Sequence, residues 1–240
     1  LQHAMMRTWD HWNIHRVSNE PIDIVHYESI GTMSDALSIH LEEIYNGLTD
    51  EKSKFYTEKI FKALTDLSTE NRGTRRPCSL GEICTLTDAR EEEIIRVIDQ
   101  FRSPGCAFLM PSAQHAISTE TTIDISHESI MRVWRRLKRW VEEEGESAQL
   151  YLRLSKSAAL YQEGKTGLWV NPELQLALQW KSLVKPNITW ASRYDAAFER
   201  ALNFLEYSKL QHEKEITRKE NIQKRNLRRA RNSAIVLGLA

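Results

Sequence analysis

The stretch Ile123–Trp140, IDISHESIMRVWRRLKRW, decides the expected fold, because it joins a short strand to an amphipathic helix. Ile123 and Ile125 alternate with polar residues, as the residues of a half-buried strand do. Apolar residues then recur at helical spacing, while arginines and lysines occupy the other face; the apolar set is Ile130, Val133, Trp134, Leu137, Trp140 and Val141. The sequence therefore predicts a strand that leads directly into a helix.

A histidine, His127, lies at the junction between this strand and this helix. Ser126 is a favourable N-cap, and Glu128 places a negative charge in the first turn, where the helix dipole favours it. The free backbone N–H groups of a helix start can bind an anion. His127 is thus the candidate ligand-binding residue of the chain, with a phosphate as the expected ligand. The alternative is a histidine that only fills the joint.

The residues before this stretch predict three helices and a hairpin. We expect a helix capped by Thr49, a short helix with a capping box of Ser79 and Glu82, a longer helix over Asp88–Arg102, a strand over Cys106–Met110, a polar loop over Pro111–Glu120 and a returning strand over Thr121–Ile125. Three helices followed by a two-stranded hairpin is the order of a winged-helix domain, a variant of the helix-turn-helix.

The remaining segments read as helical, so the expected fold class is mainly α. The helices are expected over Leu1–Trp12 with a break at Asn13, from Thr32 or Ser34 to Leu48 after a turn at Tyr27–Gly31, over Ser147–Glu163, over Pro172–Leu183, and from Trp190 onward. From Lys209 this last helix loses its apolar stripe and becomes a basic arm.

Composition indicates a soluble globular protein, with 41% hydrophobic and 28% charged residues and a formal net charge of zero. Three cysteines are too few for a disulfide framework or a zinc cage, and reduced thiols in a cytosolic compartment are expected. His11 and His15 have the spacing of metal ligands on a helix, but no third ligand is evident. No metal site is therefore predicted.

Gly164-Lys165-Thr166 resembles the end of a phosphate-binding loop, but the rest of that motif is missing. Ala159 stands where the first glycine belongs, and the preceding residues are helical in pattern. Gly164 is better explained as a helix C-cap. No other catalytic motif occurs in the sequence, so no catalytic residue is assigned.

A winged helix raises the question of DNA binding. The helix that would enter the groove, Asp88–Arg102, carries five acidic residues against three arginines, and the wing loop Pro111–Glu120 contains no lysine or arginine. Because groove binding depends largely on neutralising phosphates, this charge pattern favours a protein-facing module. A DNA-binding transcriptional regulator with a helical dimerisation tail remains the alternative.

The basic arm Lys209–Arg231 precedes an apolar run that begins at Ser233. It is either a solvated helix or the cytoplasmic flank of a membrane span, as the positive-inside pattern would suggest. Eight apolar residues are too few for a bilayer, which takes about 20. A membrane-tethered helical adaptor is thus a third hypothesis. We expect the chain to be part of a longer protein.

The order of elements resembles the region after the nucleotide-binding core of STAND-class P-loop NTPases, specifically the bacterial novel STAND group. The resemblance is carried by LQHAMMRTW, YESIGTMSDALSIHLEEIYNGL, SLGEI, ISHESIMRVWRRLKRWVEEE and SKSAALYQEG with the later LALQW. It implies residues 1–48 as an AAA-like helical lid, 49–144 as the winged helix, 145–208 as a C-terminal helical segment, 209–232 as a basic arm or linker, and 233–240 as the start of a transmembrane helix.

The resemblance also implies a function. In the family, a histidine at the strand-to-helix junction of the winged helix contacts the β-phosphate of ADP, and the matching position here is His127. The phosphate loop, Walker B acid and sensor arginine are missing, so ADP or ATP with Mg²⁺ would be bound mainly by an upstream P-loop core. The implied protein is a cytoplasmic signalling ATPase switch that forms homo-oligomers on activation, carries a downstream repeat or sensor domain, and could be anchored to the inner membrane near Ser233.

Overall fold

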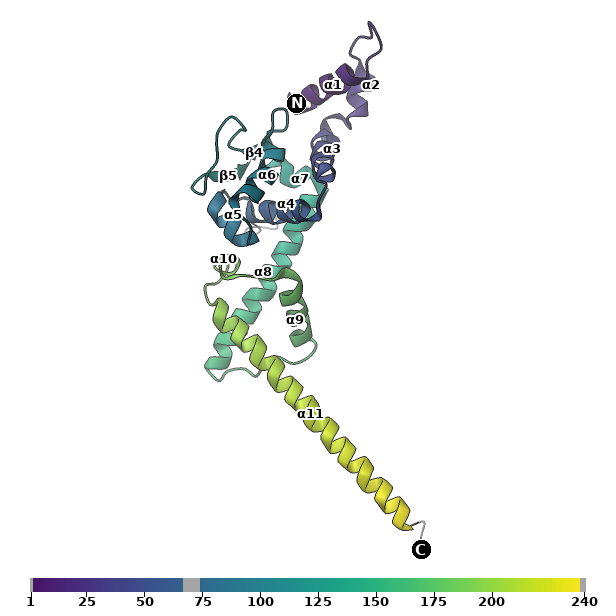
Figure 1. Cartoon of the computed structure of the whole chain (residues 1–240), viewed down its shortest axis with the longest axis vertical. Coiled ribbons are helices and arrows are strands. Elements are labelled where there is room, and N and C mark those ends of the chain that lie inside the picture. The colour runs from purple at the N-terminus through teal and green to yellow at the C-terminus, as the bar shows by residue number, and fades with distance from the viewer. Residues whose placement is uncertain (1, 67–73, 238–240) are drawn as a thin grey trace. The chain divides into compact units, whose positions relative to one another are not determined.

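The computed structural model describes residues 2–66 and 74–237, and it is mainly helical, as the sequence predicts (Figure 1). The chain divides into two compact units, Leu1–Glu146 and Ser147–Ala240. The first unit contains the predicted hairpin and His127, and the second is helical. The finer domain boundaries given above remain predictions.

Three helices begin the first unit: α1 (Gln2–His15), α2 (Ile24–Ser29) and α3 (Thr32–Gly47). The predicted break at Asn13 is wrong, because α1 continues to His15, and the exposed Asn13 side chain does not interrupt the backbone hydrogen bonds. The predicted turn at Tyr27–Gly31 is largely helix α2, which begins with a capping box of Asp23 and His26. Local capping therefore creates a helix where the apolar period gave no sign of one.

The predicted three helices and hairpin are present, and one further strand joins the sheet. In chain order the elements are α4 (Glu51–Ala63), β3 (Cys78–Ser79), α5 (Leu80–Thr87), α6 (Glu91–Arg102), β4 (Leu109–Met110) and β5 (Thr122–Ile125). The strands lie in the antiparallel order β3-β5-β4, with Cys78 opposite Ile123 and Leu109 opposite Ile125. A second small ladder, β1 (Thr65–Asp66) with β2 (Thr74–Arg75), flanks residues 67–73.

Two predicted helix caps are wrong. Asp50, and not Thr49, caps α4 by accepting a hydrogen bond from the backbone N–H of Ser53 at 2.7 Å. Asp88 ends α5 in the left-handed conformation, with φ of 52°, instead of starting α6. The cap is one residue later than predicted at α4, and α6 begins after Arg90, two residues beyond Asp88. The Ser79 cap of α5 is confirmed.

The core of this unit forms where the helices α4 to α6 and the sheet meet. Its largest fully buried side chains include Trp134, Phe61, Phe101, Phe108, Leu41, Ile60, Leu64, Leu80, Ile83, Ile94 and Ile98. Trp134 packs edge-on against Phe61 and against Trp140, with ring centroids 4.9 and 5.3 Å apart. The junction after β5 is therefore anchored by an aromatic cluster.

The helix predicted after β5 is broken into α7 (Ser129–Val133) and α8 (Arg135–Gln162). The break is at Trp134, whose backbone is extended, with φ of −79° and ψ of 101°. No proline or glycine lies near it. Since a sharp break needs an identifiable cause, the contacts of the Trp134 side chain must supply it.

The wing loop between β4 and β5 is shaped by Arg102 at the end of α6. This side chain is only 5% exposed and donates hydrogen bonds to the backbone carbonyls of Ser112 and His115 at 3.1 and 2.7 Å. It also pairs with Asp99 at 2.6 Å. The arginine that the sequence placed on a groove-facing helix therefore serves the fold of the wing.

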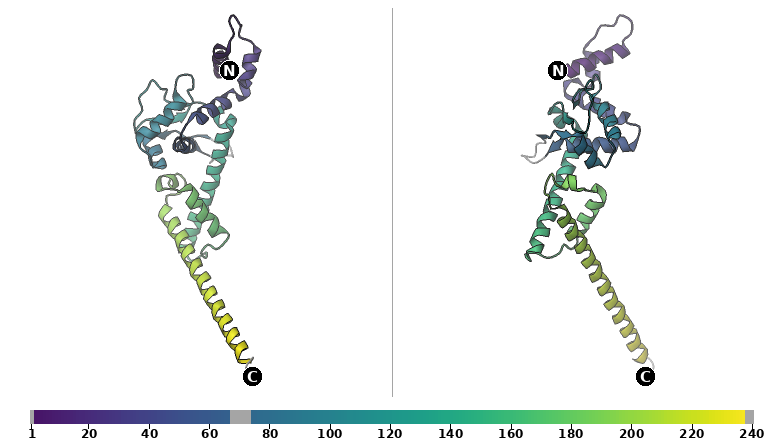
Figure 2. Two further views of the ribbon diagram at one scale, coloured as in Figure 1. Left: turned by 45° about the vertical axis from the view of Figure 1, so that its right-hand side comes forward. Right: turned by 60° about the vertical axis from the view of Figure 1, so that its left-hand side comes forward.

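The second unit contains the later part of α8, then α9 (Glu173–Val184), α10 (Ile188–Ala191) and α11 (Phe198–Leu237). The predicted C-cap Gly164 is confirmed, because it has φ of 70° and the N–H groups of Gly164 and Lys165 bond back to Tyr161 and Leu160. The helix predicted from Trp190 instead starts at Phe198. It then runs without interruption to Leu237 (Figure 2).

Candidate functional site

His127 is exposed and lies between β5 and α7. The predicted N-cap Ser126 is wrong, since α7 begins at Ser129 and its cap position is Glu128, which makes no side-chain cap bond. The Ser126 hydroxyl is buried, and within residues 2–66 and 74–237 it has no hydrogen-bond partner. Because α7 has only five residues, its amide groups carry no anion site of their own. The candidate ligand-binding group at this position is therefore the imidazole of His127.

Ser126, the residue before His127, donates its backbone N–H to the Phe108 carbonyl at 3.0 Å, and the Phe108 ring lies 5.4 Å from the ring of His3 of α1. Burial lowers the pKa of His3 below its ordinary value, and the charges of Arg7 and His127 lower it further. The ring of His3 stacks on that of His40 of α3, with centroids 5.2 Å apart, and both rings contact Phe108 before β4. We call His3, His40 and His127 the imidazole group. It combines residues from α1, α3 and the junction after β5.

His40 is the most enclosed member of the imidazole group. Burial lowers the pKa of His40 to about 4, and the positive charge of Arg7 lowers it further. His40 is therefore neutral near pH 7, with one ring nitrogen protonated and the other free to accept a hydrogen bond. The guanidinium of Arg7 pairs with Glu43 of α3. Apart from that carboxylate, the charges that act on His3 and His40 are positive, which suits an anionic ligand.

A second cluster, the Glu42 node, ties α3 to the break between α7 and α8. The Glu42 carboxylate accepts a hydrogen bond from the indole Nε1 of Trp134 at 2.7 Å. It also accepts two from Arg136, from Nη2 at 2.7 Å and from Nε at 3.0 Å. The guanidinium of Arg136 lies 3.9 Å from the ring centre of Tyr45. These contacts hold Trp134, where the helix breaks, and Arg136, at the start of α8, to one carboxylate.

The charge state of the node follows from these contacts. Burial raises the pKa of Glu42, but the hydrogen bonds from Arg136 and Trp134 outweigh it and hold the pKa below its ordinary value. The carboxylate is thus ionised near pH 7, and its paired oxygens are satisfied. A charge-assisted, two-point contact of this kind fixes orientation as well as distance.

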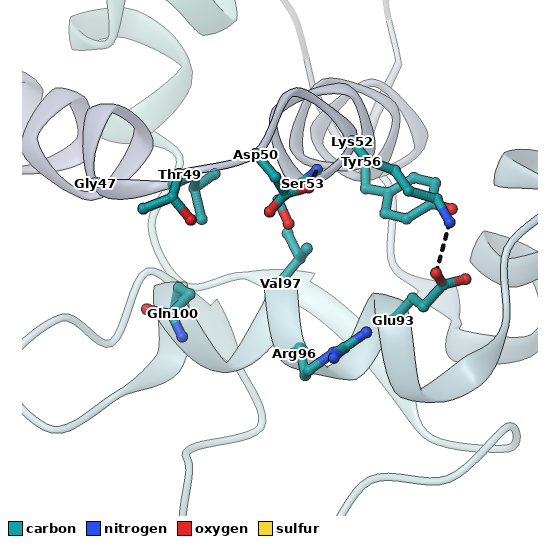
Figure 3. Close-up of a pocket in the computed structure, with 11 residues that line it drawn as sticks. Gly47, Thr49, Asp50, Lys52, Ser53, Tyr56, Glu93, Arg96, Val97 and Gln100 are labelled. Atoms are coloured by element: carbon teal, nitrogen blue, oxygen red, sulfur yellow. Dashed lines mark hydrogen bonds and ion pairs between the residues drawn. The ribbon is translucent and has the colours of Figure 1, made fainter.

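A pocket of about 490 Å³ lies where the end of α3 and the start of α4 face α6 (Figure 3). Figure 3 shows Lys52 of α4 and Glu93 of α6 pointing toward one another across it, and their charged atoms are 2.6 Å apart. The hydrogen bond with Glu93 raises the pKa of Lys52 and lowers that of Glu93. Asp50 and Ser53 of the lining contact one another at the cap of α4, and Lys52 is paired with Glu93, so these polar side chains serve the fold and the pocket supports no catalytic assignment.

The other sequence candidates do not form sites. His11 and His15 lie on α1 with their rings stacked at 4.3 Å, and the described residues contain no group of three or more side chains placed to hold a metal. Cys78, Cys84 and Cys106 are free thiols. Among the helices the structure describes, none combines the length and apolarity needed to cross a membrane. Residues 238–240 of the predicted span lie outside the described part.

Sequence reasoning missed His3, His40 and Glu42. His3 and His40 are 37 residues apart and Glu42 is 92 residues from Trp134. No local spacing links such residues, so only the packing of α1 and α3 on the hairpin brings them together. The one available sign was that each is polar on an otherwise apolar stretch of helix.

Comparison with known proteins identifies a family for this chain. The family profile described as Novel STAND NTPase 1 matches residues 1–167, which covers α1 to the end of α8. No match was found among curated proteins or among solved structures. Because the matched region is well over half of the sequence, the chain belongs to the Novel STAND NTPase 1 family.

Proposed function

We propose that this chain is the lid and winged-helix part of a STAND-type signal-transducing ATPase switch, in which His127 responds to bound ADP or ATP. Family membership supports a role in a STAND NTPase and nucleotide binding by the whole protein. Upstream, a P-loop core in the same polypeptide would hold most of the nucleotide with Mg²⁺. Bound ADP would supply a β-phosphate oxygen as a hydrogen-bond acceptor.

The observation that carries the proposal is the position of His127. It is exposed, and its neighbour Ser126 donates a backbone N–H to the carbonyl of Phe108, whose ring packs against His3 of α1. A residue of the proposed winged helix and one of the proposed lid are therefore linked through Phe108. The surrounding donors are imidazoles and the Arg7 guanidinium, which fit a phosphate and not a metal ion. A ligand bound there would touch both parts at once and favour their closed arrangement.

The Glu42 node supports the part of the proposal that concerns how nucleotide binding changes the arrangement of the helices. It joins α3, a lid helix, to the helices that leave the winged helix through one carboxylate. A movement of α3 would thereby change the orientation of α8, because the charge-assisted contact of Glu42 links the two helices. Exchange of ADP for ATP would release the closed arrangement and permit assembly into a homo-oligomer, with a downstream repeat or sensor domain supplying the stimulus.

The test is His127→Ala in the full-length protein. Loss of a phosphate contact should speed ADP release by about tenfold or more and raise basal signalling. His212→Ala is the matched control, because His212 is a histidine of α11 that contacts Asn171 far from this site in sequence. An ADP release rate equal to that of the unaltered protein would remove the sensor role.

DNA binding is the second candidate, and the charge of α6 disfavours it. Arg102 is buried in the wing, and Arg90 lies 3.7 Å from Glu93, while Glu91 and Glu92 stand in the first turn. A gel-shift titration against salt tests this candidate, because DNA binding should weaken steeply as the salt concentration rises.

Anchoring to a membrane near Ser233 is tested separately by fractionating cells that express the full-length protein.

A further inference from the structure

A chain of polar contacts runs through the imidazole group. The Cys106 sulfur lies 3.7 Å from Nε2 of His40, and Nδ1 of His40 lies 3.3 Å from Nε2 of His3. Cys106 precedes β4, so this series of contacts links the hairpin to α3 and α3 to α1. Each contact needs one donor and one acceptor, so the position of one hydrogen fixes all the others.

The Cys106 thiol determines which group donates and which accepts in each of these contacts. A cysteine S–H is a weak donor and its sulfur a weak acceptor, whereas a neutral imidazole nitrogen is a good acceptor. The favoured arrangement therefore has the Cys106 S–H donating to Nε2 of His40. Nδ1 of His40 must then carry its hydrogen and donate to Nε2 of His3. His3 is left with its own hydrogen on Nδ1.

Nδ1 of His3 is the last atom in this series of hydrogen-bonded side chains. Among the residues that the structure describes, Nδ1 of His3 has no hydrogen-bond partner. The histidine is half-buried and packs against Phe108, whose carbonyl accepts a hydrogen bond at 3.0 Å from Ser126, the residue before His127. An N–H fixed in direction, close to cationic groups, is suited to an oxyanion. A histidine with a free choice of tautomer would offer a weaker and less directed donor.

We propose that His3 is a second imidazole ligand for the phosphate of the nucleotide, and that His40 and Cys106 are positioning residues that hold its Nδ1–H toward that phosphate. The inference rests on the proposed function of His127, and it adds a lid residue to the site. It also explains why a polar pair, His3 and His40, is packed against Phe108 instead of an apolar one. Contact with a phosphate would bind α1 to the junction after β5.

Nitrogen NMR of the histidine rings tests the tautomers directly in this chain. We expect the Nδ1–H form for both His3 and His40. In Cys106→Ala, the fixed preference of His40 and His3 should be lost, whereas Cys106→Ser, which keeps a donor, should preserve it. An Nε2–H form at His3 in the unaltered chain would overturn the proposal, whether or not any variant folds.

Release of ADP from the full-length protein tests the ligand role. His3→Ala should speed release by about tenfold, while His3→Asn, which keeps an N–H near the position of Nδ1, should restore most of the retention. His212→Ala again serves as the control. If His127→Ala speeds release and His3→Ala does not, only the role of His3 is lost. If neither variant speeds release, the proposed function itself is wrong.

Discussion

The helices α1 and α2 and the helices α4 to α6 belong to one compact unit, yet they bury very different amounts of apolar surface. The cluster that joins α1 and α2 to α3 consists of Ala4, Ile30 and Ala36, whereas the core around α4 to α6 contains many large side chains. Two tryptophans show the contrast, since Trp9 of α1 is 55% exposed and Trp134 is fully buried. Helices α1 and α2 therefore bury little apolar surface, so a ligand can shift them at a lower free-energy cost than it could shift a packed core.

The largest expected effect is at Trp134. Trp134→Ala should lower the free energy of unfolding by about 3–5 kcal/mol, because it leaves a cavity against Phe61 and Phe101 and removes the indole donor to Glu42. Trp134→Phe is the matched variant, since it keeps a ring in the core while it removes the indole N–H donor and a smaller part of the buried volume. Urea denaturation followed by circular dichroism measures both. Equal losses for the two variants would show that the hydrogen bond outweighs the packing.

An intermediate effect is expected at Glu42, where the contact between α3 and the residues Trp134 and Arg136 is polar. Glu42→Gln should cost about 1–2 kcal/mol, because the charge-assisted bonds from Arg136 weaken while the shape is kept. The pKa of this carboxyl is below its ordinary value of 4.5 in the folded chain, so its contribution is complete above that pH and is lost as the pH falls through the folded pKa.

The measurement is the difference in unfolding free energy between the unaltered chain and Glu42→Gln, taken from pH 7 down to pH 3. It should be constant near neutrality and shrink in acid. Glu43→Gln is the control for Glu42, because Glu43 is also on α3 but pairs with Arg7 of α1. A difference that stays constant down to pH 3 would show that the charge of Glu42 contributes nothing to the node.

The sequence predicted the elements around the hairpin because their signals are local. The alternation at Ile123 and Ile125 and the helical period of α4 to α6 do not depend on distant residues, and these elements are present. The break at Trp134 was not predicted, and the indole at that position bonds to Glu42, 92 residues earlier, a contact that no local pattern shows. Arg102 was counted among the arginines of a helix that would enter a groove, yet its side chain donates to backbone carbonyls of the wing loop.

The candidate site shows the same limit more strongly. His127 could be selected from its place between a strand and a helix, but the N-cap argument that accompanied it failed, because the helix starts two residues later than the Ser126 cap required. His3 and His40 could not be selected, since nothing in LQHAMMRTW or around His40 shows that the two rings stack. Sites formed by contacts between distant helices are invisible to periodicity.

The smallest expected effect is at Trp9, and it tests whether α1 and α2 are as weakly held as their burial indicates. Trp9→Ser should change the free energy of unfolding by less than about 0.5 kcal/mol, because the side chain is largely in solvent and makes only a tilted ring contact with Trp12. Trp12 is the matched position, since its Nε1 donates to the Glu20 carbonyl at 3.0 Å and Arg16 lies over its ring. Trp12→Ser should therefore cost more than Trp9→Ser by the same urea assay. If Trp9→Ser instead costs as much as a core substitution, α1 is part of the cooperative core, and a phosphate at His3 and His127 would have to work against the packing of the whole unit.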